Sequence, residues 1–92
     1  MTEMKKLIAM LKEAEIPFEL TEDVCRNPAN QVWYPSHEEP VCDVICLEFS
    51  YGGTEGLLEI MGLVDDDFND IGVEGYLTAD EVFHRIKRHY ES

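Results

Sequence analysis

Two amphipathic segments, one near each end of the chain, constrain its fold more than any other feature. From Thr2 to Glu15, and again from Thr78 to about Tyr90, apolar residues recur every three or four positions, which predicts a helix with one apolar stripe. Such a helix buries its stripe against another layer, so the residues between the segments must supply an apolar surface. The stripes consist of Met4, Leu7, Ile8, Leu11 and Ala14 in the first segment and Val82, Phe83, Ile86 and Tyr90 in the second.

Local signals mark where both predicted helices begin or end. Ile16 precedes Pro17, and the residue before a proline is displaced from the helical backbone region, so the first helix should end there. Thr78 and Glu81 have the spacing of a capping box, in which the Thr78 hydroxyl accepts from the Glu81 amide and the Glu81 carboxylate accepts from the Thr78 amide. We therefore expect the second helix to start directly after Thr78.

The residues between the helices favour strands. They are rich in β-branched and aromatic residues and lack a helical stripe, and glycine, proline and asparagine separate the runs, as at Asn27–Asn30. We predict strands at Phe18–Val24, Gln31–Tyr34, Val41–Tyr51 and Leu57–Leu63, with a further short strand at Val73–Leu77.

The segment Val41–Tyr51 is the strongest strand signal. Because side chains alternate between the two faces of a strand, one face should carry mainly apolar residues and meet the helices, with Asp43 as an interruption. The glycine-rich segment Gly52–Gly56 predicts a hairpin that returns the chain into Leu57–Leu63. The helix-facing residues are predicted to be Val41, Ile45, Leu47, Phe49 and Tyr51, with Cys42, Val44, Cys46, Glu48 and Ser50 on the opposite face.

Together these elements predict a single α+β domain over residues 1–92. Its order is a helix, a four- to five-stranded mostly antiparallel sheet, and a helix, with both helices packed on one face of the sheet. A chain this short buries only roughly 60% of the surface that its unfolded form exposes, so the core is expected to be thin.

Acidic residues dominate the charge of the chain. It carries 20 Asp and Glu against 7 Lys and Arg, a formal net charge of −13, and from Asn27 to His84 thirteen acids occur without one Lys or Arg. A surface this negative repels nucleic acids and anionic membranes and attracts basic proteins and cations. We expect a basic protein surface as the partner, with no direct nucleic-acid or membrane binding. Acidic residues also keep small proteins soluble, which is the simpler explanation of the same charge.

The cysteines and the N-terminal sequence favour a soluble cytoplasmic protein. Cys25, Cys42 and Cys46 are an odd number, whereas disulfide-rich secreted domains usually carry an even one. The apolar run Leu7–Leu11 is shorter than the ~7 residues that the core of a signal peptide needs. No apolar stretch approaches the ~18 residues of a membrane span.

An acidic cluster after Leu63 invites comparison with a calcium-binding loop. Asp65, Asp67 and Asn69 match the first, third and fifth positions of an EF-hand. The sixth position, however, is Asp70 where a glycine makes the turn, and the twelfth is Tyr76 where a glutamate closes the shell. We expect a solvated loop, with a weak cation site of another type as the alternative.

A zinc site and a catalytic site are both poorly supported. Cys25, His37, Cys42 and Cys46 could form a zinc set, but on one strand Cys42 and Cys46 lie about 13 Å apart, too far for one ion. The histidines, including His84 and His89 near a helix C-terminus, match no nucleophile motif, and a capping role explains the last two. We predict no catalytic residues, no metal ligands and no cofactor, and favour a protein that is not an enzyme.

Two stretches of the second half carry a resemblance. The runs Gly56–Leu63 and Val73–Phe83, in which a Leu-Thr-Ala-acid-acid-Val-Phe sequence opens the terminal helix, resemble small uncharacterised proteins of bacterial mobile elements and prophages. The resemblance covers about the last half of the chain and implies no activity and no site residues. It implies an accessory protein that binds a host protein or one encoded by the element.

Two hypotheses of function follow. The first is a non-enzymatic interaction module whose acidic surface binds a basic protein, in its sharpest form by occupying the nucleic-acid groove of that protein. Aromatic residues anchor many interfaces, although Trp33 could equally belong to the core. The second is a small-ligand or divalent-metal module with a minor enzymatic role. A homodimer through an exposed sheet edge fits either. The predicted partner contacts are Trp33, Tyr34, Glu38, Glu39, Asp65, Asp66 and Asp67.

Overall fold

The computed structural model of the chain describes residues 3–21, 31–46, 56–65, 67 and 70–92. Two helices enclose a run of five strands in the chain order. The elements are α1 (Glu3–Glu13), β1 (Glu19–Leu20), β2 (Gln31–Tyr34), β3 (Cys42–Ile45), β4 (Leu58–Met61), β5 (Val73–Leu77) and α2 (Ala79–Glu91).

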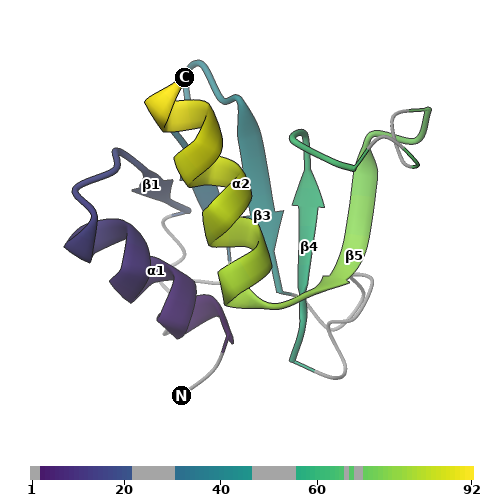
Figure 1. The fold of residues 1–92 in the computed structure, drawn as a ribbon, viewed down its shortest axis with the longest axis horizontal. Helices are drawn as coiled ribbons and strands as arrows, with labels where there is room; N and C mark the ends of the chain where they lie inside the picture. The colour runs from purple at the N-terminus through teal and green to yellow at the C-terminus, as the bar shows by residue number, and fades with distance from the viewer. Residues whose placement is uncertain (1–2, 22–30, 47–55, 66, 68–69) are drawn as a thin grey trace.

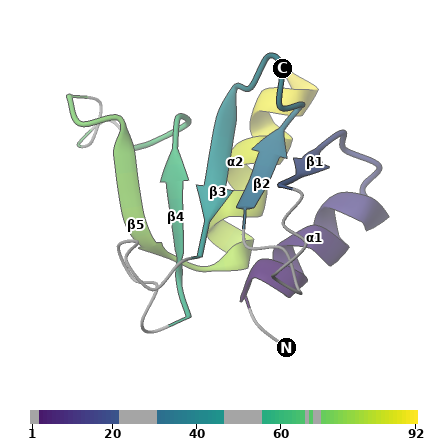
Figure 2. The ribbon, with the colours of Figure 1, turned by 180° about the vertical axis from the view of Figure 1, so that it is seen from behind.

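The strands form one antiparallel sheet whose spatial order, β1-β2-β3-β4-β5, follows the sequence. Both helices lie on one side of this sheet, as Figure 1 shows, and Figure 2 shows the other side, with the sheet in front of the helices. The predicted α+β fold, its element order and the placement of both helices on one face are therefore confirmed.

The first helix ends through backbone hydrogen bonds two residues before the predicted boundary at Glu15. The Glu15 amide donates to the Lys12 carbonyl and the Ile16 amide to the Leu11 carbonyl, both at 3.1 Å, which is the pattern of a Schellman motif. Glu15 takes the left-handed conformation, with φ at 59°, where glycine is the preferred residue. The motif turns the chain so that Ile16 is buried in the core.

The second helix begins with the predicted capping box. The Glu81 amide donates to the Thr78 hydroxyl, and the Thr78 amide donates to the Glu81 carboxylate, both at 3.3 Å. A second carboxylate joins this terminus, because the Ala79 amide donates to Glu3 Oε1 at 3.1 Å. Glu3 thus ties the start of α1 to the positive end of the α2 dipole.

The core lies between the helices and the inner face of the sheet. From the helices it receives Leu7, Leu11, Val82 and Ile86, none of which has measurable exposure. From the sheet it receives Val32, Val44, Leu58 and Ile60, which are equally buried. Partly buried side chains, among them Ile8, Phe18 and Phe83, complete it at the edges.

The prediction of which side of β3 meets the helices was wrong. Cys42 and Val44 are buried, whereas Val41 is exposed and Ile45 is half-buried on the opposite side. Pairing with β2 decides this, since Tyr34 faces Cys42 and Val32 faces Val44 across the strands. Both alternating sets of β3 contain apolar residues, so alternation alone did not determine the core side.

The other strand predictions agree where the structure describes the chain. β2 and β5 have their predicted bounds, and β4 lies inside Leu57–Leu63, paired antiparallel with β3. β1 occupies Glu19–Leu20 of the predicted Phe18–Val24. The turn at Asn27–Asn30, the residues of the third strand after Cys46 and most of the glycine-rich hairpin lie outside the described residues.

Candidate functional site

The side of the sheet that faces away from the helices presents one row of side chains across all five strands. Cross-strand partners share a face, and the register pairs Glu19 with Trp33, Trp33 with Asp43, Asp43 with Met61 and Met61 with Val73. A second row pairs Gln31 with Ile45 and Ile45 with Glu59. We call this surface the open face; it consists of Glu19, Thr21, Gln31, Trp33, Asp43, Ile45, Glu59, Met61 and Val73. Within it Glu59 is itself buried, with 9% exposure.

Hydrogen bonds fix one half of the open face. The Trp33 indole Nε1 donates to Thr21 Oγ1 at 2.9 Å, and that hydroxyl lies 2.8 Å from Gln31 Oε1, to which it can donate. The Gln31 amide nitrogen then donates to Asp43 Oδ2 at 3.1 Å. This chain of contacts crosses from β1 to β3, so Trp33 and Asp43 are held in place before any partner arrives.

The other half of the open face is apolar and exposed. Met61 is 53% exposed and lies beside Val73. Val41 precedes β3, and Ile71, 70% exposed, precedes β5 at the same end of the sheet. The Gly62 amide donates to the Gly72 carbonyl at 3.1 Å, which holds these strand ends together. Exposed apolar side chains gathered on one surface are typical of interaction sites.

Acidic loops border this apolar end. The connections β2–β3 and β4–β5 lie at the same end of an antiparallel meander, the upper end in Figures 1 and 2. Glu38 and Glu39 are exposed in the first connection, and Asp65, Asp67 and Asp70 are exposed in the second.

Cations are segregated from these acids. Six of the seven Lys and Arg lie in α1 and α2, and the described residues outside the two helices include none. The sheet and its described loops therefore carry negative charge alone, and the helical layer carries the cations.

One acid of the sheet is withdrawn from this surface. Glu74 is buried on the helix side, where the guanidinium of Arg85 donates to both carboxylate oxygens at 2.7 and 2.9 Å. The Asp65 amide donates a third hydrogen bond at 2.9 Å. Arg85 and the Asp65 amide together hold the pKa of the Glu74 carboxyl below its usual range, although burial acts in the opposite direction.

The predicted partner contacts do not all lie on one surface of the structure. Trp33 is half-buried on the open face, and its ring meets His37 edge-on with centroids 4.8 Å apart. Tyr34 points the other way into the core, 2% exposed, with its hydroxyl 2.8 Å from His89 Nδ1. Glu38, Glu39, Asp65 and Asp67 are exposed, and Asp66 lies outside the described residues.

Sequence reasoning missed Met61, Val41 and Ile71. Met61 ends a β4 sequence, Leu58–Met61, whose other three residues are buried, so alternation could not single it out. The glycines that follow Met61 and Ile71 were the available signal, because they mark the ends of the strands on this side.

The cysteines are suited to packing more than to chemistry. Burial, with a smaller effect of the Asp43 charge, raises the pKa of the Cys42 thiol to about 12. Burial also raises the pKa of Cys46. Thiolates are the reactive and metal-binding form, and burial disfavours that form at both cysteines, most strongly at Cys42. Cys25 lies outside the described residues.

Two further findings concern metal binding and membrane spans in the described part of the chain. No group of three or more His, Cys, Asp or Glu side chains lies there in an arrangement that could hold a metal ion. Neither α1 nor α2 is long and apolar enough to cross a membrane.

Comparison of the chain with protein-family models, with curated proteins and with solved structures finds no match.

Proposed function

We propose that this chain is a non-enzymatic protein-interaction module whose open face and acidic loops bind a basic protein surface. The observation that carries the proposal is the row from Glu19 to Val73, which combines two acidic residues with aromatic and apolar side chains across five strands. Protein interfaces commonly combine an apolar centre with a polar rim, and this surface has both.

Charge supports the choice of a basic partner. The layer that bears the open face contains no described Lys or Arg, and the formal net charge of the chain is −13. A basic surface would be steered toward this side of the molecule, because the cations of the helical layer lie on the other side. The same charge disfavours nucleic acids and anionic membranes as direct partners.

The apolar end of the open face would supply binding energy that electrostatic attraction alone does not. Charge complementarity mainly raises association rates and specificity, whereas buried apolar and aromatic side chains supply most of the binding energy. Met61 and Trp33 lie in the same row, separated by Asp43. We expect Met61 to be a main anchor and Trp33 to contact the partner from its fixed position.

The biological setting belongs to the same proposal. The resemblance of the second half to mobile-element proteins suggests that the partner is a host protein or one encoded by the element. Reduced thiols fit a cytoplasmic location. A homodimer through an exposed sheet edge stays a prediction, and self-repulsion of two chains at a net charge of −13 acts against it.

A pair of matched variants tests the proposal. Met61→Lys places a cation in the centre of the open face, whereas Tyr90→Lys makes the same change of charge at a 49% exposed apolar residue of α2. Proteins captured from a bacterial extract at low salt are identified, purified and titrated against each variant. We expect a basic partner whose affinity falls at least about tenfold for Met61→Lys, equivalent to ~1.4 kcal/mol.

Tyr90→Lys is the control that separates a local effect at Met61 from a general effect of added charge. Tyr90→Lys should bind within about twofold of the natural chain, and binding of the natural chain should weaken as salt rises, because exposed charges are screened. Equal losses in the two variants, or a partner that is acidic and insensitive to salt, would contradict the proposal.

A further inference from the structure

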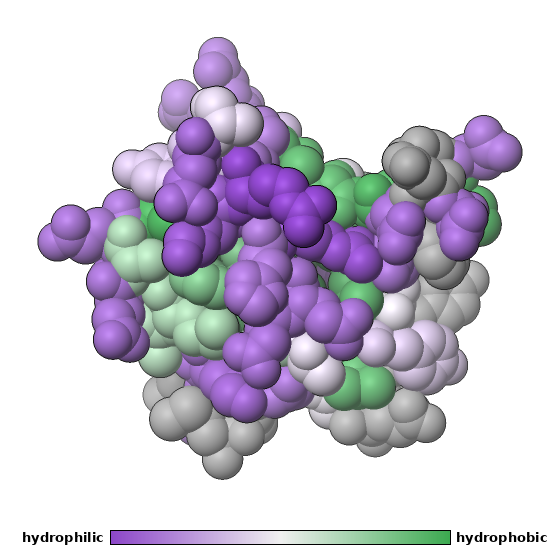
Figure 3. Space-filling view, in the orientation of Figure 1, coloured by the Kyte–Doolittle hydropathy of each residue, from purple (hydrophilic) through white to green (hydrophobic). Residues whose placement is uncertain are grey.

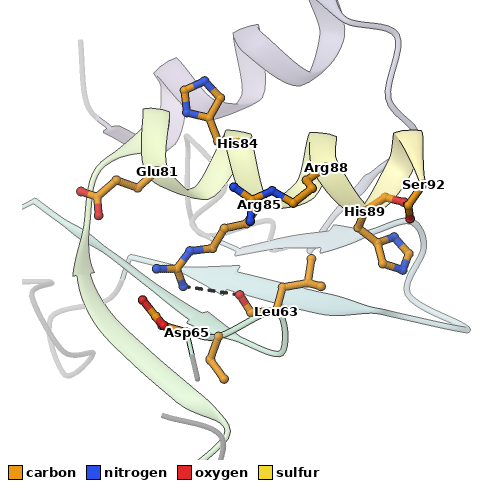
Figure 4. A pocket seen from close by; sticks show the side chains of 9 residues that line it. Leu63, Asp65, Glu81, His84, Arg85, Arg88, His89 and Ser92 are labelled. Carbon is orange, nitrogen blue, oxygen red and sulfur yellow. Dashed lines mark hydrogen bonds between the residues drawn. The ribbon is translucent and has the colours of Figure 1, made fainter. Parts of the chain in front are cut away.

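A groove runs between α2 and the connection from β4 to β5, on the side of the molecule opposite the open face. Its volume is about 680 Å³, within the ~300–1,000 Å³ typical of small-molecule sites. Figure 4 shows Leu63 on the side of the β4–β5 connection and the side chains of α2 along the opposite wall. Four residues of α2 whose side chains carry nitrogen atoms line this groove: His84, Arg85, Arg88 and His89.

Arg85 forms a fixed wall of the groove. Its guanidinium donates to both oxygens of Glu74 and, at 3.4 Å, to the Leu63 carbonyl. Asp65 and Glu81 also line the groove, and their charges add to the Glu74 hydrogen bonds in raising the pKa of Arg85. The cation of Arg85 is thus fully compensated by surrounding acids, and this end of the groove is not cationic.

Arg88 is the available cation. It is exposed one turn further along α2, and it makes no hydrogen bond or ion pair with the residues that the structure describes. In a chain with 20 acids and 7 Lys and Arg, a guanidinium beside a groove without a partner among the described residues is unexpected. Figure 4 shows its side chain folded back along α2 toward Arg85, with His84 one turn before it. Figure 3 shows this part of α2 as the most hydrophilic band on that side.

His89, the next residue of α2, is held in a defined orientation by Tyr34. Its Nδ1 lies 2.8 Å from the buried Tyr34 hydroxyl, and the two rings meet edge-on at 87°. When the phenol donates to Nδ1, the neutral imidazole carries its proton on Nε2. Protonation of the ring also leaves Nε2 as a donor. In both forms Nε2 can donate a hydrogen bond to an anion.

We propose that this groove binds the oxyanion group, phosphate or carboxylate, of a small molecule whose apolar body lies on Leu63 and Val64. Arg88 is the principal ligand, because a guanidinium matches the fork of an oxyanion with two parallel hydrogen bonds. His89 supplies a further donor from the same helix. This site is independent of the open face and goes beyond the proposed interaction function.

Three features of the molecule oppose anion binding and set its strength. The net charge is −13, the carbonyl end of α2 carries the negative pole of the helix dipole, and Asp65 and Glu81 line the groove beside Arg85. At physiological salt the screening length is about 8 Å, so the groups that line the groove dominate over distant acids. We expect a dissociation constant on the order of 1 mM for a simple ligand at moderate salt.

The test uses three small probes that carry the same aromatic ring. Phenyl phosphate, benzoate and phenol share the ring, which addresses the apolar floor, and differ in charge. Titration of the isotope-labelled chain, followed by the NMR signals of Arg88 and His89, should give saturable binding of at least one anionic probe and none of phenol. The stronger anion identifies phosphate or carboxylate as the natural group. Saturable phenol binding, or no shift with any probe at about 20 mM, would overturn the proposal.

Matched charge variants separate a site from general attraction. Arg88→Gln should weaken anion binding about tenfold, because a charge-assisted hydrogen bond is lost. Lys87→Gln removes the same charge from the adjacent residue, which does not line the groove, and should change the affinity less than twofold. Equal effects of the two variants would show nonspecific attraction and refute the assignment. Both residues are exposed, and the circular dichroism of each variant checks that it folds.

Discussion

Loss of the Arg85 guanidinium should destabilise the protein by an amount that depends on pH. In the native structure the Glu74 carboxylate accepts three hydrogen bonds, two from Arg85 and one from the Asp65 amide. The side chains of Arg85 and Glu74 are only 21% and 11% exposed. Arg85→Met keeps the apolar stem and removes two of the three donors, so a carboxylate is left buried with one.

The expected cost follows from the burial of this pair. Breaking a buried ion pair costs ~3–5 kcal/mol, and the remaining exposure of Arg85 places this case lower, at about 2–3 kcal/mol. A domain of this size typically has a free energy of unfolding of roughly 5–14 kcal/mol, so such a loss is easily measured. Urea unfolding followed by the fluorescence of Trp33, the single tryptophan, reports it directly.

The pH dependence has a definite sign. The pKa of Glu74 in the folded protein lies below its ordinary value of 4.5, first because of the hydrogen bonds from Arg85. Its stabilisation is therefore fully present above about pH 4.5 and is lost as the pH falls through the folded pKa. The difference between the natural chain and Arg85→Met should be constant from about pH 8 to 5.5 and should shrink below about 4.5.

A double-mutant cycle decides whether the two side chains act as a pair. Glu74→Gln removes the charge but keeps an acceptor, so we expect a smaller loss of about 1–2 kcal/mol. The double variant should be more stable than the sum of the single losses predicts, by at least about 1 kcal/mol. Additive losses, or a cost of Arg85→Met that is the same at pH 3.5 and pH 7, would refute this account of the pair.

Three further changes probe the fold by urea or thermal unfolding. Gly62→Ala should lower the free energy of unfolding by more than about 2 kcal/mol, because the new Cβ would lie 2.5 Å from a backbone oxygen at a φ of 87°. Gly72→Ala, at a φ of 76° but with open space around the Cβ, should lower it by only about 1 kcal/mol. Glu15→Gly should stabilise by about 1 kcal/mol by relieving a left-handed residue, and should raise the melting temperature by roughly 4–8 °C. Tyr34→Phe should cost about 1 kcal/mol through the lost contact with His89, and an unchanged melting temperature would show that this contact contributes nothing.

Much of the fold was predictable because its signals are local. The stripe of α1 and the capping box at Thr78 involve residues within one or two helical turns. The capping box was confirmed, and so was the stripe except at Ala14, which is exposed beyond the end of α1. The earlier end of α1 was missed because Glu15 occupies a position where glycine is expected, so the Schellman motif had no sequence signature. Local rules fail where an unfavourable residue is held in place by the burial of its neighbour, here Ile16.

The candidate surfaces were predictable only in their chemistry. The absence of Lys and Arg between Asn27 and His84 predicted that the central part of the chain is acidic. Glu38 and Glu39 are exposed because they lie in a loop between two strands. Alternation could not show that Tyr34 points into the core while Trp33 points out, because both neighbours are aromatic.

The sequence by itself determined which segments become helices and strands, and it confined the described cations to the helices, because periodicity, capping and composition act over a few residues. Tertiary structure alone decided which side of each strand is buried and which distant residues share a surface. Cross-strand register aligned Glu19, Trp33, Asp43, Met61 and Val73, and packing of α2 on the sheet placed Arg88 and Leu63 along one groove. These juxtapositions depend on contacts between residues far apart in the chain, which no local pattern specifies.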